Sequence, residues 1–302
     1  MHEVSIRETD EERDADAILE LWREAFPLDV ISRESWLHYG RALPPESQLG
    51  DWVAEEHGRV VGTGYVFLGV ASADRSAHCR VLVRGAKRRR GIGGALFERI
   101  QEHAEATGAQ RLLADFEESR AGVAFAETLG FRQARAEQTA VLDPRTVRLA
   151  PPGDVDLRPL RDVDPRVAYE VDMEAMLDTP STERFERMPY DEWAALVLEH
   201  PLLSFDGSFV ALVDGAPAAV SLLTADAESG RASSMFTGTM RAHRGRGLGL
   251  AVKLASIEWA ARNGIVQLAT RNDEQNAPML AINRRLGYRP APRRVEFVRA
   301  CS

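Results

Sequence analysis

Hydrophobic and polar positions along this chain follow two periodicities, and stretches of each kind come in the same order twice. In the first half, apolar residues spaced as one helix face predict helices through Ile18 to Phe26 and around Trp36. Further helices are expected from Ile92 through Ile100, and from Ala121 to Leu129 with its end at Gly130. Runs rich in β-branched and aromatic residues predict strands at Val4–Arg7, Trp52–Glu55, Val60–Val70, Arg80–Val83, Arg111–Ala114 and within Phe131–Leu142.

The second half repeats this order of elements. Helices are predicted near Val167–Met176, Tyr190–Leu198 and Asn276–Leu286. Another helix carries one apolar stripe made of Leu248, Ala251, Val252, Ala255 and Trp259. The predicted strands are Val155–Leu157, Phe209–Val213, Ala218–Leu223, Ala232–Met240 and Leu268–Thr270.

Three landmarks keep this repeat in one register. The segment Arg88-Arg89-Arg90-Gly91-Ile92-Gly93 returns 156 residues later as Arg244-Gly245-Arg246-Gly247-Leu248-Gly249. Val53–Gly58 corresponds to Val210–Gly215, and Leu129-Gly130-Phe131 to Leu286-Gly287-Tyr288. A period this long indicates two copies of a whole domain, as the length of 302 residues also does. We expect domains at 1–150 and 151–302, joined by the proline-rich connector 144–154.

Composition narrows the function classes. The net charge of −8 argues against a broad nucleic-acid surface and weakly favours cationic substrates. The start Met1–Arg7 lacks the pattern of a secretory signal, and the longest uncharged run, Val60–Ala73, is too short to span a bilayer. The expectation is a soluble cytoplasmic protein with no membrane partner. Only two cysteines are present, so no disulfide framework and no metal site are expected.

One cysteine has a histidine beside it. His78-Cys79 has the composition of a base and a nucleophile, but neighbours on a strand point to opposite faces. Two ordinary strand residues are the better interpretation.

The duplicated glycine-rich segment carries the candidate chemistry. Each copy follows a predicted strand and opens a predicted helix, so its backbone N–H groups can converge on an anion at a helix N-terminus. A Walker loop needs Gly-Lys-Ser/Thr where Gly93-Gly94-Ala95 stands, and a dinucleotide fingerprint needs a third glycine where Leu96 and Leu250 stand. The basic run Lys87–Arg90 is diluted in the second copy while the glycines remain, which disfavours nucleic acid.

At these segments the chain resembles the GCN5-related N-acetyltransferases (GNAT), whose signature is Gln/Arg-x-x-Gly-x-Gly/Ala after a strand. The resemblance implies an α/β fold of two tandem domains, each a mixed, mostly antiparallel central sheet flanked by helices. It also implies that each loop holds the pyrophosphate of acetyl-coenzyme A and that the preceding strand contacts the pantetheine arm. The residues so implied are Val81, Leu82, Val83, Arg88, Arg89, Arg90, Gly91, Ile92, Gly93 and Gly94 in the first half, and Thr237, Gly238, Thr239, Arg244, Gly245, Arg246, Gly247, Leu248, Gly249 and Leu250 in the second.

The halves differ beyond the loop. The second half resembles the family more closely, with Asn276 as the helix-start asparagine that approaches the cofactor, where the first half has Ser119. A plain helix N-cap is the alternative for both. Many family members place a tyrosine acid four residues before the glycine of the Leu-Gly-Phe segment, but Ala126 and Asn283 occupy those positions here.

The sequence supports the cofactor-binding residues more strongly than it supports any catalytic residue. Asp178 lies in a loop that often lines the acceptor pocket in the family, which makes it a candidate base, although a capping or solvated aspartate is the better interpretation. Glu170, Asp172 and Glu174 read as a solvated acidic face.

The layout is also similar to tandem acetyltransferases of the mycothiol synthase type, in which one half does the chemistry. The resemblance therefore implies an acetyl-CoA-dependent N-acetyltransferase acting on the amine of a small molecule, with the second half favoured as the active one. Two alternatives stay open: a non-catalytic acyl-CoA binding or sensing protein, and a protein or peptide N-acetyltransferase. The acceptor, the acyl length and the oligomeric state are left undetermined.

Overall fold

The computed structural model describes residues 4–150, 153 and 155–301, and within these the chain forms two compact units. Unit 1 comprises residues 1–136, 182–186 and 294–302, and unit 2 comprises residues 137–181 and 187–293. Each unit therefore contains a segment from the other half of the sequence. The boundary near Ala150 stays a prediction for the repeat, and Pro151, Pro152 and Asp154 of the expected connector, like the start Met1–Glu3, lie outside the described residues.

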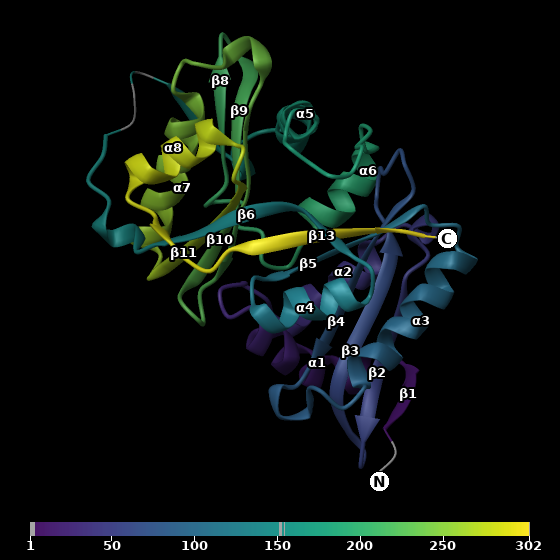
Figure 1. The fold of residues 1–302 in the computed structure, drawn as a ribbon. Coiled ribbons are helices and arrows are strands. Elements are labelled where there is room, and N and C mark those ends of the chain that lie inside the picture. Colours follow the sequence, from purple (N-terminus) through teal and green to yellow (C-terminus); the bar gives the residue numbers. More distant parts are fainter. Residues whose placement is uncertain (1–3, 151–152, 154, 302) are drawn as a thin grey trace. The chain divides into compact units, whose positions relative to one another are not determined.

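Unit 1 is built on a sheet with the strand order β1-β2-β3-β4-β5-β13 (Figure 1). All neighbours are antiparallel except β4 and β5, which run parallel. The strands are β1 (Ser5–Glu8), β2 (Gly50–Glu56), β3 (Arg59–Leu68), β4 (Ser76–Val83), β5 (Arg111–Glu117) and β13 (Arg294–Ala300), and the helices are α1 (Glu11–Ala25), α2 (Arg33–Ala42), α3 (Ile92–Ala106) and α4 (Arg120–Thr128).

Helices cover both faces of this sheet, as the alternation along β3 requires. Val60 packs in an apolar cluster with α1, whereas its neighbour Val61 packs with Ile92 and Leu96 of α3. A third cluster joins α3, α4 and β5 to the C-terminal strand β13 through the buried side chains of Val295 and Phe297. The C-terminal strand is thus part of the unit 1 core, a role that the sequence pattern did not predict.

Unit 2 repeats this arrangement with the strand order β7-β8-β9-β10-β11-β6. Its parallel pair is β10 with β11, and the other neighbours are antiparallel. The strands are β6 (Arg132–Leu142), β7 (Asp156–Pro159), β8 (Phe209–Val213), β9 (Ala216–Asp226), β10 (Arg231–Thr239) and β11 (Gln267–Asp273), and the short β12 (Arg289–Pro290) pairs with β6. The helices are α5 (Pro165–Met176), α6 (Tyr190–Trp193), α7 (Leu248–Arg262) and α8 (Ala277–Leu286). A π-helical segment, Ala194–Leu198, continues α6.

Consecutive residues at the end of β10 show which helix covers which face of unit 2. A Cβ added at Gly238 would meet the Cβ of Ala175 in α5 at 2.6 Å, and one added at Gly249 of α7 would meet Oγ1 of Thr239 at 3.1 Å. Helix α5 therefore lies on one face and α7 on the other. Both units confirm the expected mixed, mostly antiparallel sheets flanked by helices.

Candidate active site

In both units the two parallel strands separate before they end. In unit 1, β4 pairs with β5 from Ser76 to Cys79, and in unit 2, β10 pairs with β11 from Arg231 to Ser233. Beyond these points each strand continues for several residues without a ladder partner on that side among the described residues. Alternate backbone groups of this free edge are open to a bound molecule, because an unpaired N–H or C=O needs a partner. The predicted strand contacts, Val81–Val83 and Thr237–Thr239, lie on these free edges.

Strand β10 carries an additional irregularity at the opening. Its pairing with β9 shifts register between Ser234 and Phe236, so Met235 is an extra residue that β4 lacks. A bulge of this kind re-aims the side chains that follow it. The two strand edges are therefore not equivalent.

Each free edge leads into a glycine turn at the start of a helix. Gly91 and Gly247 stand at the N-cap positions of α3 and α7 with φ of 84° and 79°, in the left-handed region that glycine adopts without strain. No side chain caps either helix start, and the first helical hydrogen bonds run from Ala95 N to Gly91 O and from Ala251 N to Gly247 O. The first N–H groups of both helices, at Ile92–Gly94 and Leu248–Leu250, are thus available to an anion.

The same pair of contacts fixes both turns. Arg88 donates from Nε to the carbonyl of Val83, and Arg244 donates from Nε to the carbonyl of Thr239, at 2.9 and 3.1 Å. The backbone N–H of Gly85 donates to Glu24, and that of Arg241 donates to Glu174, at 2.8 and 2.6 Å. These contacts tie the first helix of each unit to the end of the central strand, so each glycine turn is held in place before any ligand binds.

The charges around the two turns are balanced differently. In unit 1, Lys87 and Arg90 both pair with the buried carboxylate of Glu56, at 2.5 and 2.8 Å. Val213 stands at the place of Glu56 in unit 2, where Arg246 donates instead to Nδ1 of His243 at 3.1 Å. Within the part of the chain that the structure describes, no carboxylate pairs with Arg246. This exposed guanidinium is free to bind a phosphate group, whereas Lys87 and Arg90 of unit 1 share one carboxylate.

Asp178 does not occupy the environment of a base. Its carboxylate accepts hydrogen bonds from Arg241 at 2.5 and 2.7 Å and from Arg244 at 2.6 Å. The hydrogen bonds from Arg241, then those from Arg244, lower the pKa of Asp178 to about 2. A carboxylate held this firmly in its charged form is a poor proton acceptor at neutral pH. Asp178 therefore braces the turn, and this environment disfavours a role as the base.

The two helix-start polar residues act as N-caps. Asn276 Oδ1 accepts the N–H of Met279 at 3.3 Å at the start of α8, and Ser119 Oγ accepts the N–H of Gly122 at 3.1 Å at the start of α4. Each satisfies one of the N–H groups that a helix start leaves unpaired. The capping role accounts for both residue types, and a cofactor contact of Asn276 stays a prediction.

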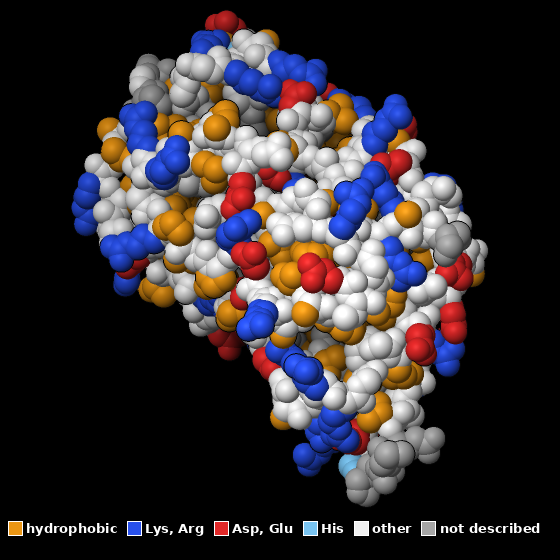
Figure 2. Space-filling model, viewed as in Figure 1, with side chains coloured by type: hydrophobic (Ala, Val, Ile, Leu, Met, Phe, Trp, Pro, Cys, Tyr) orange, Lys and Arg blue, Asp and Glu red, His pale blue; other side chains and the backbone are white. Residues whose placement is uncertain are grey.

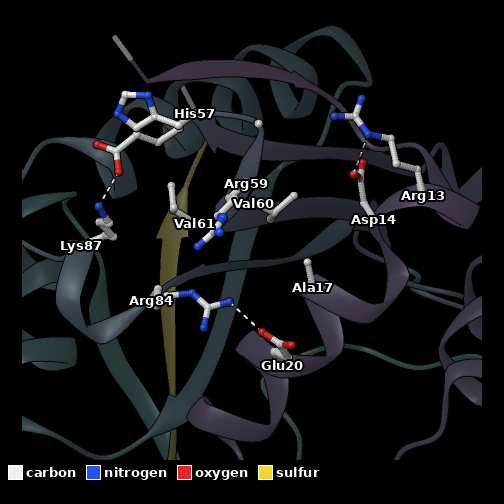
Figure 3. A pocket seen from close by; sticks show the side chains of 12 residues that line it. Arg13, Asp14, Ala17, Glu20, His57, Arg59, Val60, Val61, Arg84 and Lys87 are labelled. Carbon is white, nitrogen blue, oxygen red and sulfur yellow. Dashed lines mark hydrogen bonds and ion pairs between the residues drawn. The ribbon is translucent and has the colours of Figure 1, made fainter. Parts of the chain in front are cut away.

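A hollow lies beside the segment that follows the central strand in each unit. In unit 1 it measures about 810 Å³ and lies between α1, the β2–β3 turn at His57, and Arg84 and Lys87. Figure 3 shows the ion pair Arg84–Glu20 within it, and Lys87 there pairs with Glu56. The matching hollow of unit 2, about 380 Å³, is bounded by Glu174, Pro217 and Met240–His243. Neither includes residues of the separated strand edges.

The structure gives little support to a metal site, a membrane-spanning helix or a cysteine nucleophile. The described residues hold no cluster of three potential metal ligands and no helix long and apolar enough to cross a membrane. His78 binds Glu183 at 2.9 Å, whereas Cys79 is buried and burial raises the pKa of its thiol to about 12, so the two do not form a nucleophilic pair. On the face shown in Figure 2, basic and acidic side chains are interspersed.

Comparison with known proteins agrees with this geometry. A model of the acetyltransferase (GNAT) family matches residues 15–131 and 169–288, which is most of both halves. The chain belongs to the GNAT acetyltransferase family. No curated protein matches the chain at a significant level.

Solved structures show the tandem form of the GNAT fold. A tandem GNAT protein from the clavulanic acid biosynthesis pathway matches with a TM-score of 0.73 and 23% identity, over 99% of each chain. A GCN5-related N-acetyltransferase from Sphaerobacter thermophilus matches with a TM-score of 0.75 and 20% identity, over 99% of this chain and 96% of that one. At these identities the likeness establishes the shared fold.

Within this tandem GNAT fold, the halves also differ in the layer between the parallel strand pair and the helices after the glycine turn. Five positions of unit 1 that are apolar are polar in unit 2. The unit 1 residues are Phe97, Ala114, Phe116, Ala126 and Phe131, and the corresponding unit 2 residues are Lys253, Thr270, Asn272, Asn283 and Tyr288.

Sequence reasoning missed most of this polar layer. The helix pattern assigned α7 one apolar stripe, but α7 is buried around most of its circumference and Lys253 is only 2% exposed. A lysine inside such an apolar helix was the available signal. Aligning the two halves position by position, beyond the shared motifs, would have found the other four.

The acidic residues of α5 also differ from expectation. Glu170 pairs with Arg187 at 2.6 Å and Glu174 braces Arg241, but Asp172 is buried and accepts a hydrogen bond from Trp193 Nε1 at 2.7 Å. Burial raises the pKa of Asp172 to about 7. The interpretation of a solvated acidic face is therefore wrong for Asp172, which joins α5 to α6.

Proposed function

We propose that this GNAT protein is an acetyl-CoA-dependent N-acetyltransferase that acetylates the amine of a small molecule, with unit 2 as the working half. The observation that supports this most is the free edge of β10, which is followed, after the turn at residues 240–247, by the uncapped start of α7. That combination fits an elongated ligand with an anionic end. The pantetheine amides would bind the strand and the diphosphate would bind the helix start.

The residues of unit 2 have distinct tasks in this proposal. The N–H groups of Leu248, Gly249 and Leu250 and the guanidinium of Arg246 hold the diphosphate, and the turn is kept in shape by Arg244 and Asp178. Backbone groups of Thr237–Thr239 orient the pantetheine arm and supply donors for the developing oxyanion. The coenzyme supplies the activated acetyl group. The net charge of −8 favours a cationic acceptor such as a protonated amine, which must lose its proton before it attacks.

Unit 1 has the same turn but a weaker case for chemistry. Lys87 and Arg90 beside its turn are paired with Glu56, and its layer behind the parallel strands is apolar. Arg89 also holds φ of 63°, where the second copy has Gly245, a conformation that costs a non-glycine residue about 1 kcal/mol. These differences support a structural or weaker binding role for unit 1.

A calorimetric titration with acetyl-CoA tests the proposal. Gly247→Glu places a negative charge where the diphosphate binds, and it should abolish binding to unit 2. Gly247→Ala carries the same backbone strain without the charge and is the matched control. The pair Gly91→Glu and Gly91→Ala asks the same question of unit 1. Loss of binding in Gly91→Glu alone would reassign the working half.

Release of free thiol with a panel of small amines separates an enzyme from a binding protein. Steady turnover with one amine supports catalysis. Tight binding without turnover supports the acyl-CoA sensor instead, and turnover with peptides alone supports the peptide acetyltransferase.

A further inference from the structure

Lys253 lies among polar residues, all buried except the half-buried Asn272, that the glycine turn and the coenzyme-binding strand do not explain. Nζ of Lys253 donates to Oγ1 of Thr270 at 3.2 Å and lies 5.1 Å from the ring centroid of Tyr288. Nδ2 of Asn283 donates to Oδ1 of Asn272 at 2.7 Å. We call these five residues the Lys253 cluster.

Two polar atoms of the Lys253 cluster have no partner within the described chain. These are the hydroxyl of Tyr288 and Oδ1 of Asn283, in side chains that are 6% and 5% exposed. An unpaired buried polar atom costs about 1 to 3 kcal/mol, so such atoms point to a missing ligand or water. The corresponding residues of unit 1, Phe131 and Ala126, fill an ordinary apolar core. The fold therefore does not require polarity here, and the cluster needs a functional reason.

The place of the cluster in unit 2 suggests that reason. The last parallel pair between β10 and β11 joins Ser233 to Ala269, and Thr270 is the next residue of β11. Thr270 thus stands where the two strands begin to separate. A pantetheine arm that binds the free edge of β10 from Thr239 inward ends at this point, so its sulfur would lie beside Thr270.

We propose that Lys253 supplies, through the hydroxyl of Thr270, the proton that the sulfur takes up when the acetyl group leaves. The inference rests on the proposed function, and it assigns the acid that unit 2 otherwise lacks because Asn283 cannot release a proton at neutral pH. Thr270 is the group that meets the sulfur, and Lys253 is a positioning residue that acts through it.

The step balances in atoms and charge. The neutral amine nitrogen forms a bond to the acetyl carbon and releases one of its protons to solvent, the carbon–sulfur bond breaks, and its electron pair stays on sulfur. The Thr270 hydroxyl proton moves to sulfur while an Nζ proton of Lys253 moves to Thr270 Oγ1. Lys253 ends neutral, and solvent returns its proton between turnovers. No oxidant or metal is consumed.

The surroundings of Lys253 favour proton donation near neutral pH. Burial alone lowers the pKa of Lys253 to about 7, so the amine gives up and regains a proton near neutral pH. Tyr288 is the titratable side chain in contact with Lys253, and burial raises the pKa of that phenol above its ordinary range, so it stays neutral. No described carboxylate from α7 or the strands beneath it contributes to the lysine's shift.

The first test needs no acceptor. Coenzyme A, the thiol product, is bound to the full-length protein and its thiolate absorbance is followed with pH. Lys253→Met replaces the amine by an apolar chain of similar length, so this variant should fold at least as well as the parent. In the parent, part of the bound thiolate should form between pH 7 and pH 8, where some Lys253 still carries its proton, because a positive partner favours the thiolate; in Lys253→Met this early part should be missing.

The control is Ser256→Ala on the same helix. Ser256 is 2% exposed and bonds to Ser221, outside the Lys253 cluster. Its substitution should leave the thiol titration unchanged. Equal thiol titrations in the parent and Lys253→Met would overturn the inference.

The second test measures thiol release between pH 6 and pH 9, with an amine that the parent protein acetylates. Lys253→Met and Thr270→Val should each lower the rate at pH 7 by about 100-fold. In both variants the fall in rate above the lysine pKa should disappear. The double variant should be no slower than either single variant. Unchanged acetyl-CoA binding in these variants separates the relay from the coenzyme site. Failure of the parent to bind coenzyme A sinks the proposed function itself, whereas binding and turnover with an unaltered pH profile in the variants sinks only the relay.

Discussion

At the scale of single residues, the two halves are distinguished by where charge is buried and what neutralises it. Glu56 pairs with the cations beside the first glycine turn, whereas Arg246 beside the second has no carboxylate partner among the described residues. Unit 2 also buries Asp172 and Lys253, on opposite sides of its sheet. Burial of an ionisable group disfavours its charged form, so both residues have pKa values near neutrality. Such groups link stability or chemistry to pH in the range where the protein works.

Asp172 predicts a pH dependence of folding. Its pKa is about 7 in the folded protein against 3.8 ordinarily, so between pH 4 and pH 7 the folded state retains a proton that the unfolded chain has lost. Stability from this group therefore falls as pH rises through that window. Asp172→Asn keeps an acceptor for Trp193 Nε1 and removes the ionisation. We expect the variant to gain about 4 kcal/mol over the parent at pH 8 and little at pH 4, measured by urea unfolding. An equal difference at both pH values would mean that Asp172 is charged in the folded state.

Asp178, unlike Asp172, should not change its charge between pH 5 and pH 9, so it should not shape the pH dependence of catalysis. Because Arg241 and Arg244 hold its pKa at about 2, it is fully charged throughout the pH range of an assay. Asp178→Asn should weaken acetyl-CoA binding through a looser turn but leave the shape of the pH–rate profile between pH 5 and pH 9 unchanged. Profiles of kcat and kcat/KM measured for both proteins check this. Loss of the acidic limb in the variant would restore Asp178 as the base.

At the scale of elements, each unit contains a parallel pair of strands that separate beside the start of a helix. The helix starts of each unit differ in whether a side chain caps them. Helices α4 and α8 begin with side-chain caps, whereas α3 and α7 begin with glycine and none. The uncapped starts are the ones next to the free strand edges. A helix start that lacks a cap keeps its N–H groups for a ligand, so the absence of a cap is itself part of the site.

Asn276 allows capping and cofactor contact to be separated. Asn276→Ser retains a cap of similar strength for α8, so stability should change by less than about 0.5 kcal/mol. If the amide also contacts the coenzyme, affinity for acetyl-CoA should fall several-fold in this variant. Ser119→Asn is the reciprocal change in α4 and should not lower affinity. Calorimetry alongside thermal unfolding measures both quantities, and unaltered affinity in Asn276→Ser would leave the residue with capping alone.

The order of these elements could be predicted from the sequence because each depends on local pattern and on the repeat. The glycine turns, the strands before them and the helices after them all lie where the pattern placed them. Long-range choices could not be predicted. Nothing in the alternation of Val295, Glu296 and Phe297 says which sheet this strand joins, and the partners of Asp178 are more than 60 residues away. Burial of Lys253 and Asp172 likewise depends on tertiary packing, which overrides the polarity of the residue type.

At the scale of the whole molecule, the two domains are duplicated in sequence but exchange segments in the fold. Strand β13 from the end of the chain completes the sheet of unit 1, and residues 137–142 of β6 complete that of unit 2. In each case the inserted strand is antiparallel and covers the outer edge of the parallel pair. The strand beside each parallel pair thus comes from the other half of the sequence, so we expect folding of either half to depend on the whole chain.

Removal of β13 tests this dependence. A chain that ends at Arg293 lacks Val295, Phe297 and Val298, which are at most 6% exposed, and it leaves the edge of β5 unpaired from Arg111 to Glu117. Burial of each such side chain contributes about 1.5 to 3 kcal/mol, a sum comparable with the whole stability of a domain. Hydrogen exchange should therefore show loss of protection across β5, while β11, which pairs with β6, keeps its protection. A peptide of residues 294–302 added in excess should restore protection in β5, since it supplies the missing strand. Equal loss in β5 and β11 would instead show that the two units unfold as one cooperative block.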